Sequence, residues 1–179
     1  MEKEEKQISS EQIYKGRIID LYLDSVLCPG GIESKREYVT HKGGAGILVV
    51  DKENYVYLVK QFRYAYREEL FEIPAGKLEE GENPLETAKR ELEEETGLIS
   101  NHFEEYGVLY PSPGYTNEKL FIYKTTPESV GQTRFDSDEF IDLYRIKIDE
   151  AFEMVKNGVI KDAKTVYAIC RYMAEQFGK

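Results

Sequence analysis

Apolar and polar residues alternate in two stretches near the start of the chain. Residues 17–27 place aliphatic side chains between polar ones, the period of two that is typical of a half-buried strand. A second alternating stretch, 35–41, follows the turn Cys-Pro-Gly-Gly (28–31) and can pair with the first as a hairpin. Residues 1–42 are therefore predicted to form a small N-terminal antiparallel β domain.

The remaining residues, 43–179, mix strand and helix patterns in what we predict to be the main domain. Its most apolar run, 45–50, precedes a polar turn and a second run, 55–60, which predicts a hairpin whose first strand is buried on both faces. Further strands are predicted at 70–73, 105–110, 120–125 and 141–148, with the Pro- and Gly-bearing stretch 111–118 as a loop.

One helix is well specified at both ends. Asn83 can cap it, Pro84 suits its first turn, Glu86 stands at the capping-box position and Gly97 can end it. The helix is therefore predicted over residues 84–96.

Two more helices are predicted in the last thirty residues. They cover 150–157, with Asp149 as N-cap, and 163–177, with Asp162 as N-cap. Because strands and helices do not follow a strict βαβ alternation, the expected fold class is α/β of the α+β type, a mixed sheet covered by helices.

Composition narrows the classes of partner. A chain of 179 residues suffices for one domain with an appendage, and its formal charge of −10 would repel nucleic acid. No apolar run approaches the roughly 18 residues of a spanning helix, and the first residues lack the apolar core of a signal peptide. Cys28 and Cys170 stand in no metal-ligand spacing. We expect a cytoplasmic protein with two buried, unpaired thiols and no membrane partner.

Half of the net charge lies in residues 76–98, whose local balance is −5. At helical spacing Glu91 and Glu95 border the apolar stripe of the predicted helix, and Glu94 is close by. Like charges one turn apart repel, so a positive partner is expected, and clustered carboxylates suit hard cations such as Mg²⁺ or Mn²⁺. Arg90, one turn from Glu94, can hold that side chain. The alternative is an ordinary solvated helix face.

The spacing of the whole segment favours the metal site. Gly76 to Leu98 follows the pattern G-x5-E-x7-R-E-U-x-E-E-x-G-U, in which U is a bulky aliphatic residue. This pattern resembles the signature of the Nudix hydrolases. The resemblance implies an α/β/α sandwich whose loop-helix-loop binds two to three Mg²⁺ or Mn²⁺ ions. It implies principal metal ligands at Glu91 and Glu95, supporting ligands at Glu82 and Glu94, a carbonyl ligand at Ala75 and an orienting role for Arg90.

Motifs outside this segment resemble the ADP-ribose pyrophosphatase group of that family. They are Ser-Lys-Arg-Glu (34–37), Val-Lys-Gln-Phe-Arg (59–63), Glu-Ile-Pro-Ala-Gly (72–76), Ser-Pro-Gly-Tyr-Thr-Asn-Glu (112–118) and Asp-Ala-Lys-Thr (162–165), with Pro113 15 residues after Leu98. The group forms homodimers that exchange a small N-terminal β domain, and its arginines help to clamp the substrate.

The same resemblance implies a set of substrate contacts. Arg36 and Arg63 are candidates for the pyrophosphate or ribose, because a guanidinium grips phosphate bidentately. The weaker candidates, for the ribose end, are Glu79, Ser112, Gly114 and Glu118. The alternatives are exposed salt bridges for the two arginines and purely structural loop roles for the other four.

A general base is expected in the acidic loop 134–140. By alignment with the group Glu139 fits best, Asp136 or Asp138 can substitute, and an ordinary solvated loop is the remaining alternative. The predicted function is the metal-dependent hydrolysis of ADP-ribose to AMP and ribose 5-phosphate. Two alternatives stay open: the same chemistry on another nucleoside diphosphate sugar or dinucleotide, and a catalytically inactive nucleotide-binding sensor.

Overall fold

The chain folds into two compact units. The structure, a computed structural model, describes residues 3–133 and 140–177. The first unit is formed by Met1–Gly43 together with Tyr110–Lys119, and the second by Gly44–Leu109 together with Leu120–Lys179. The loop predicted at 111–118 therefore belongs to the unit that contains the N-terminal strands.

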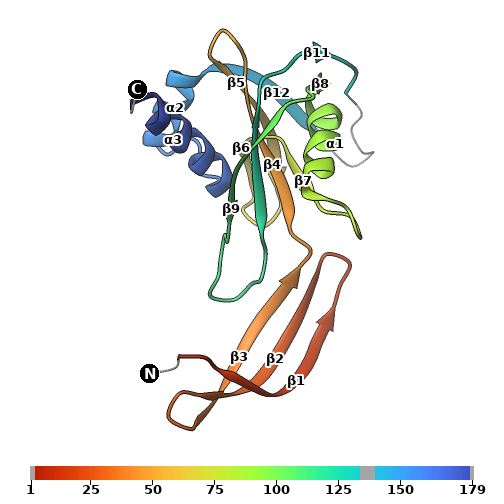
Figure 1. The fold of residues 1–179 in the computed structure, drawn as a ribbon, viewed down its shortest axis with the longest axis vertical. Helices are drawn as coiled ribbons and strands as arrows, with labels where there is room; N and C mark the ends of the chain where they lie inside the picture. The colour runs from red at the N-terminus through yellow and green to blue at the C-terminus, as the bar shows by residue number, and fades with distance from the viewer. Residues whose placement is uncertain (1–2, 134–139, 178–179) are drawn as a thin grey trace. The chain divides into compact units, whose positions relative to one another are not determined.

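The first unit is a three-stranded antiparallel sheet in the order β1-β2-β3 (Figure 1). Its strands are β1 (Lys6–Lys15), β2 (Ile19–Cys28) and β3 (Ile32–His41). The predicted hairpin is confirmed, because Cys28 pairs with Ile32 and Ile19 with His41 across the turn. The loop joins this unit through Val39, whose N–H donates to the carbonyl of Tyr115 at 2.7 Å.

The sequence pattern missed strand β1. Every residue of Lys6–Lys15 is exposed, so no alternation of apolar and polar positions marks it. Its partner β2 holds it through the backbone ladder, with register shifts between Gln7 and Ser9 and between Gln12 and Tyr14. Two side-chain bonds add to the ladder, from Gln7 to Asp24 and from Gln12 to Tyr22. A strand specified by pairing rather than by burial leaves little signal in a hydrophobic pattern.

The second unit is built on a mixed seven-stranded sheet. Its central path runs β12-β5-β4-β10-β9, while β6 pairs with β5 and β7 with β4. The pair β4 and β10 is parallel and the other pairs are antiparallel. The bounds are β4 Gly44–Val50, β5 Tyr55–Arg63, β6 Glu68–Glu72, β7 Ala75–Lys77, β9 Phe103–Leu109, β10 Leu120–Thr125 and β12 Ile141–Lys147, with the short pair β8 Leu98–Ile99 and β11 Ser129–Val130 beside them.

Helices cover both faces of this sheet, as Figure 1 shows. They are α1 (Pro84–Thr96), α2 (Ile148–Lys156) and α3 (Ala163–Phe177). All of β4 is buried, and its residues divide by parity: Ile47 and Val49 pack in one core with α1, while Leu48 and Val50 pack in the other with α2 and α3. The expected three-layer arrangement around a mixed sheet, with β4 buried on both faces, is confirmed.

Local chemistry accounts for the ends of α1. Asn83 Oδ1 accepts from the N–H of Leu85 at 2.9 Å, and Gly97 ends the helix at φ 68°, with its N–H on the carbonyl of Glu93. The predicted bounds are confirmed. Glu86, expected to complete a capping box, instead pairs with Lys89 at 2.8 Å.

The two later helices differ in their first turns. Asp162 caps α3 as expected, since its Oδ2 accepts from the N–H of Thr165 at 3.0 Å. The expected cap of α2 is wrong: this helix begins at Ile148, without a side-chain cap, and Asp149 lies inside its first turn. There a carboxylate acts on the helix dipole instead of bonding to an exposed N–H.

Candidate active site

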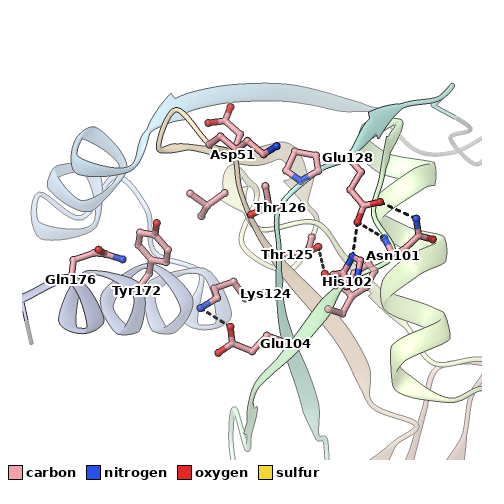
Figure 2. A pocket seen from close by; sticks show the side chains of 14 residues that line it. Asp51, Asn101, His102, Glu104, Lys124, Thr125, Thr126, Glu128, Tyr172 and Gln176 are labelled. Carbon is pink, nitrogen blue, oxygen red and sulfur yellow. Dashed lines mark hydrogen bonds and ion pairs between the residues drawn. The ribbon is translucent and has the colours of Figure 1, made fainter. Parts of the chain in front are cut away.

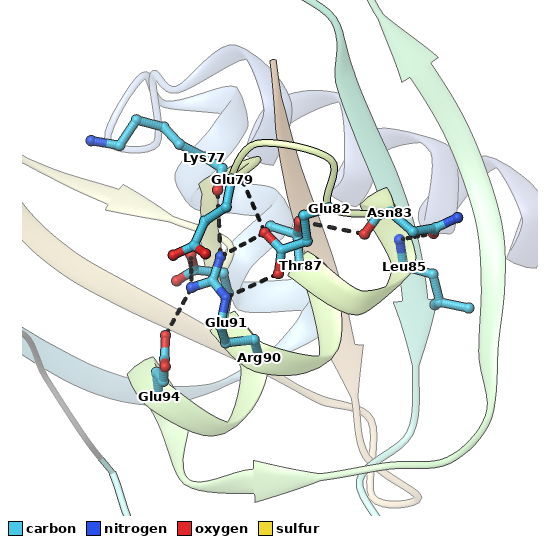
Figure 3. A network of polar contacts seen from close by, with 9 residues as sticks. All are labelled: Lys77, Glu79, Glu82, Asn83, Leu85, Thr87, Arg90, Glu91 and Glu94. Atoms are coloured by element: carbon cyan, nitrogen blue, oxygen red, sulfur yellow. Dashed lines mark hydrogen bonds and ion pairs between the residues drawn. The ribbon is translucent and has the colours of Figure 1, made fainter. Parts of the chain in front are cut away.

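Helix α1 gathers acidic side chains around one arginine, as Figure 3 shows. Arg90 Nη1 donates to Glu91 Oε1 at 2.7 Å and to Glu94 Oε2 at 2.9 Å. Arg90 Nε and Nη2 donate to the two carboxylate oxygens of Glu82 at 3.1 and 3.2 Å. Arg90 bonds to Glu94 as its spacing suggested. The divalent cation expected beside Glu91 and Glu95 stays a prediction.

This arrangement shifts the protonation of both partners. The bond from Arg90 is the main reason that the pKa of Glu82 falls to about 2. Burial alone lowers the pKa of Arg90, but its bonds to Glu82, Glu91 and Glu94 outweigh burial, so the pKa of Arg90 is raised. Glu82 and Arg90 therefore stay charged at neutral pH.

Gly76, the first fixed position of the signature, lies directly against Glu91. A Cβ built on Gly76 would stand 1.6 Å from Glu91 Oε1 and 1.9 Å from its carboxyl carbon. Gly76 lies in β7, where Ala75 pairs with Gly46 of the central strand. Only a residue without a side chain leaves room for the Glu91 carboxylate in this position.

Glu95 is the most deeply buried carboxylate of α1. It is 3% exposed, and its Oε2 accepts from the N–H of Ala75 at 2.9 Å. Ala75 thus contacts the acidic helix through its N–H. The metal ligand predicted at this residue is its carbonyl oxygen. This contact ties the end of the β6–β7 connection to the last turn of α1.

The donor set on α1 fits a hard divalent cation. It consists of carboxylate oxygens, the ligands that Mg²⁺ and Mn²⁺ prefer, and the cradle at Gly76 holds one of them close to backbone. Within residues 3–133 and 140–177, no three His, Cys, Asp or Glu side chains are close enough together to hold a metal ion as they stand. In this arrangement Arg90 lies between the carboxylates.

Arg63, a predicted substrate contact, lies at the end of β5. Its Nε and Nη2 donate to the two oxygens of Glu72 at 2.5 and 2.6 Å, and its side chain remains 41% exposed. Sequence reasoning missed Glu72, although it stands within the quoted motif 72–76. The available signal was an acidic residue in an apolar strand, where burial requires a cationic partner.

The other substrate candidates divide between the two units. Glu79 lies in the second unit, in the loop before α1, where its N–H donates to Glu82 Oε2 at 3.0 Å. The rest belong to the first unit. Arg36 pairs with Glu5 at 2.9 Å, Ser112 accepts through its carbonyl from Tyr115 and Thr116, Glu118 lies 3.3 Å from His41, and Gly114 has open space around it.

Comparison with known proteins assigns the fold and the acidic segment to one family. The model of the NUDIX domain matches residues 40–169. The chain belongs to the Nudix family. Hydrolases of this family generally need a divalent metal such as Mg²⁺, which agrees with the donor set on α1.

Two curated relatives match almost the whole chain. An ADP-ribose pyrophosphatase of Bacillus subtilis and a methanol dehydrogenase activator of Bacillus methanolicus are each 42% identical over 168 residues, which is 93% of this chain and 91% of each relative. Among solved structures, one titled "Crystal structure of ADP compounds hydrolase" has a TM-score of 0.84 at 17% identity, covering 97% of this chain and 96% of that one. This structural match shows the fold.

The candidate bases Glu139, Asp136 and Asp138 lie outside the described residues. Both cysteines are free, as expected, but Cys28 and Cys170 are half-buried rather than fully buried. No helix in the described part of the chain is both long and apolar enough to cross a membrane.

A cavity of about 890 Å³ is lined by none of the predicted site residues (Figure 2). At its rim His102 Nδ1 lies 2.8 Å from Glu128 Oε1, and Asn101 donates to the same carboxylate. The contact with His102 is the main reason that the pKa of Glu128 falls to about 2. The side chain of His102 is 92% exposed, so this is a surface contact of small energetic weight.

Proposed function

We propose that this Nudix protein hydrolyses the pyrophosphate bond of ADP-ribose, releasing AMP and ribose 5-phosphate, with two or three Mg²⁺ or Mn²⁺ ions. The observation that carries the proposal is the packing of Gly76 and Ala75 against Glu91 and Glu95 of α1. This packing places the two carboxylates beside the backbone of β7, where their oxygens are available as metal ligands. The substrate is supported by the relative from Bacillus subtilis, which is named an ADP-ribose pyrophosphatase.

The roles of the acidic residues follow from their contacts. Glu91 and Glu95 would hold the metal ions together with the carbonyl of Ala75, while Glu82 and Glu94 support them. Bound divalent ions polarise phosphoryl oxygens and lower the pKa of the attacking water. Arg90 bonds to three of the carboxylates and fixes their orientation.

Substrate binding needs cations, because the protein and a diphosphate are both negative. We assign the pyrophosphate to Arg63, whose half-exposed guanidinium is already oriented by Glu72. Arg36, Glu79, Ser112, Gly114 and Glu118 are assigned to the remaining contacts, and Glu139 to the general base.

The substrate is tested by assaying the wild-type protein with Mg²⁺ against a panel of nucleoside diphosphate derivatives. The panel contains ADP-ribose, ADP-glucose, GDP-mannose and NAD⁺, and released phosphomonoesters are quantified. We expect the highest kcat/KM for ADP-ribose. A much higher value for another member would overturn the substrate and leave the pyrophosphate chemistry in place.

A second candidate function follows from the relative of Bacillus methanolicus. That protein is named an activator of methanol dehydrogenase, with the same identity and coverage as the pyrophosphatase. A role of this chain as an activator of a dehydrogenase is tested by adding it to an NAD⁺-dependent alcohol dehydrogenase. Stimulation of the dehydrogenase would support the second candidate, and unchanged turnover would reject it.

We further propose that the protein acts in the cytoplasm as a homodimer with exchanged N-terminal domains, taken as residues 1–42. The apolar surface of the first unit supports this state. Four isoleucines there, at positions 8, 13, 18 and 32, are between 45 and 67% exposed. In so small a sheet such residues are typical of an interface.

A further inference from the structure

A buried ionic cluster joins the end of β6 to the first turn of α3. At its centre is Glu72, which is 1% exposed. It accepts two bonds from Arg63 and a third from Lys164 Nζ on its Oε2. Lys164 is 7% exposed, and its Nζ also lies 3.0 Å from Asp162 Oδ1. Two cations and two carboxylates are thus packed together inside the second unit.

Stability is a poor explanation for a buried lysine at this position. Taking charges out of water is costly, and apolar side chains of similar volume are often as good or better for folding. The other known use of a buried ion pair is to fix one conformation among several. The question is therefore which conformation this cluster fixes.

The cluster is bonded to a segment that leads directly to the Nudix helix. Next to Glu72, the N–H of Ile73 donates to Thr165 Oγ1 at 2.8 Å, and that hydroxyl donates to Asp162 Oδ2 at 2.6 Å. Two residues later, the N–H of Ala75 donates to Glu95. Residues 72–75 are therefore held by α3 at one end and by α1 at the other.

The cluster also sets the plane of Arg63. Both bonds to Glu72 use Nε and Nη2, and in the described part of the chain no bond is recorded for Nη1. Hydrogen bonds to Glu72 are the main reason that the pKa of Arg63 is raised, and the charges of Asp162 and Glu95 add to the effect. The guanidinium therefore lies within the electrostatic field of the Nudix helix.

Lys164 changes how much positive charge Arg63 can offer. Alone with Arg63, the single charge of Glu72 would neutralise the guanidinium. Lys164 shares the Oε2 atom to which Arg63 Nη2 donates. Asp162 pairs with Lys164 through Oδ1, while its Oδ2 caps Thr165 at the N-terminus of α3.

We propose that Lys164 is a positioning residue for the diphosphate-binding part of the site, acting through Glu72 to fix the plane of Arg63 and to leave its charge available to a diphosphate. This inference rests on the proposed function in one respect, the assignment of the diphosphate to Arg63. It gives the motif 162–165 a role in substrate binding that is separate from metal binding by the acidic helix.

The test compares Lys164→Met with Lys161→Met as a matched control. Lys161 stands three residues earlier and forms an exposed pair with Glu68 at 2.9 Å. For Lys164→Met we expect KM for ADP-ribose to rise about tenfold while kcat changes less than about threefold, because a binding interaction is lost. Lys164→Arg keeps the charge and should restore KM to within about threefold of the wild type. Lys161→Met should match the wild type in both constants.

Coupling to Arg63 separates positioning from a general structural effect. In an Arg63→Ala background, Lys164→Met should no longer change KM. The proposal is overturned if the change in KM persists in that background, if only kcat falls, or if Lys164→Met equals Lys161→Met. Should Lys164→Met fail to fold in a thermal scan, Glu72→Gln takes its place with the same expected coupling and the same overturning results.

The proposed function can fail independently. A wild-type protein that does not hydrolyse ADP-ribose would overturn the substrate assignment alone. The coupling is then measured by calorimetry as the affinity for ADP of four proteins. They are the wild type, Lys164→Met, Arg63→Ala and the double variant. Loss of affinity in Lys164→Met that vanishes in the Arg63→Ala background would support the positioning role, and additive losses would overturn it.

Discussion

Glu95 differs from the other acidic residues of α1 because it is buried and bonded to backbone. Glu95→Gln keeps its shape but removes the charge that a metal ligand needs. We expect kcat to fall by about 10²-fold or more, as for the loss of an essential charged group. Steady-state hydrolysis of ADP-ribose measures it, with Glu86→Gln on the exposed face of the same helix as control.

The same variant separates an enzyme from a nucleotide-binding sensor. A sensor would retain its binding and its cellular role in Glu95→Gln, whereas an enzyme would lose its function. A change in kcat of less than about threefold would place the essential metal ligand elsewhere.

Gly76 is required by the side chain that it faces. In Gly76→Ala the new methyl group would displace the Glu91 carboxylate, which is the flexible end of a side chain, so folding should survive. We expect kcat to fall by at least about 30-fold, with a melting temperature within a few degrees of the wild type. Combining it with Glu91→Gln should add little, and fully additive losses would contradict the assigned contact.

At the scale of elements, the N-terminus of α1 depends on one side chain. Asn83→Ala removes the acceptor for the N–H of Leu85, and the free energy of unfolding should drop by about 1 kcal/mol. Urea denaturation measures it, and Asn83→Asp, which retains the acceptor, is the control. Equal stability of the alanine variant and the wild type would show that the cap contributes nothing.

Elements marked by burial or by turn chemistry were predicted well. Helix α1 has the predicted bounds because its cap, its proline and its glycine are all local signals. Strand β1 was missed because all its residues are exposed, and the start of α2 was wrong because an acidic residue before a helix resembles a cap even when it lies in the first turn.

The bond between Arg90 and Glu94 could be predicted from their spacing along α1, while the role of the acidic residues as metal ligands stays a prediction. The bonds of Glu72 to Arg63 and Lys164 could not be predicted from the sequence, because they join residues 9 and 92 positions apart. Such contacts depend on how β5, β6 and α3 pack. The motifs 72–76 and 162–165 marked the residues without indicating that they meet.

At the scale of the whole molecule, the exposed apolar residues of the first unit predict a dimer. Ile13→Lys would place a charge in the proposed interface, and light scattering after size-exclusion chromatography should show a shift from dimer to monomer. Val159→Lys is the matched control, because Val159 is similarly exposed but belongs to the second unit. A wild-type protein that is monomeric at micromolar concentration would contradict the proposal.

The net charge of the protein has the same sign as the charge of its proposed substrate. A protein of charge −10 repels a diphosphate unless cations intervene, and the cations proposed to bind the diphosphate are Arg63 and the metal ions. The measurement that tests this most directly is the release of AMP and ribose 5-phosphate from ADP-ribose, followed with Mg²⁺, with excess EDTA, and after Mg²⁺ is restored. We predict stoichiometric release of both products with Mg²⁺, none in EDTA and full recovery on restoration. Hydrolysis that persists in excess EDTA would contradict the account.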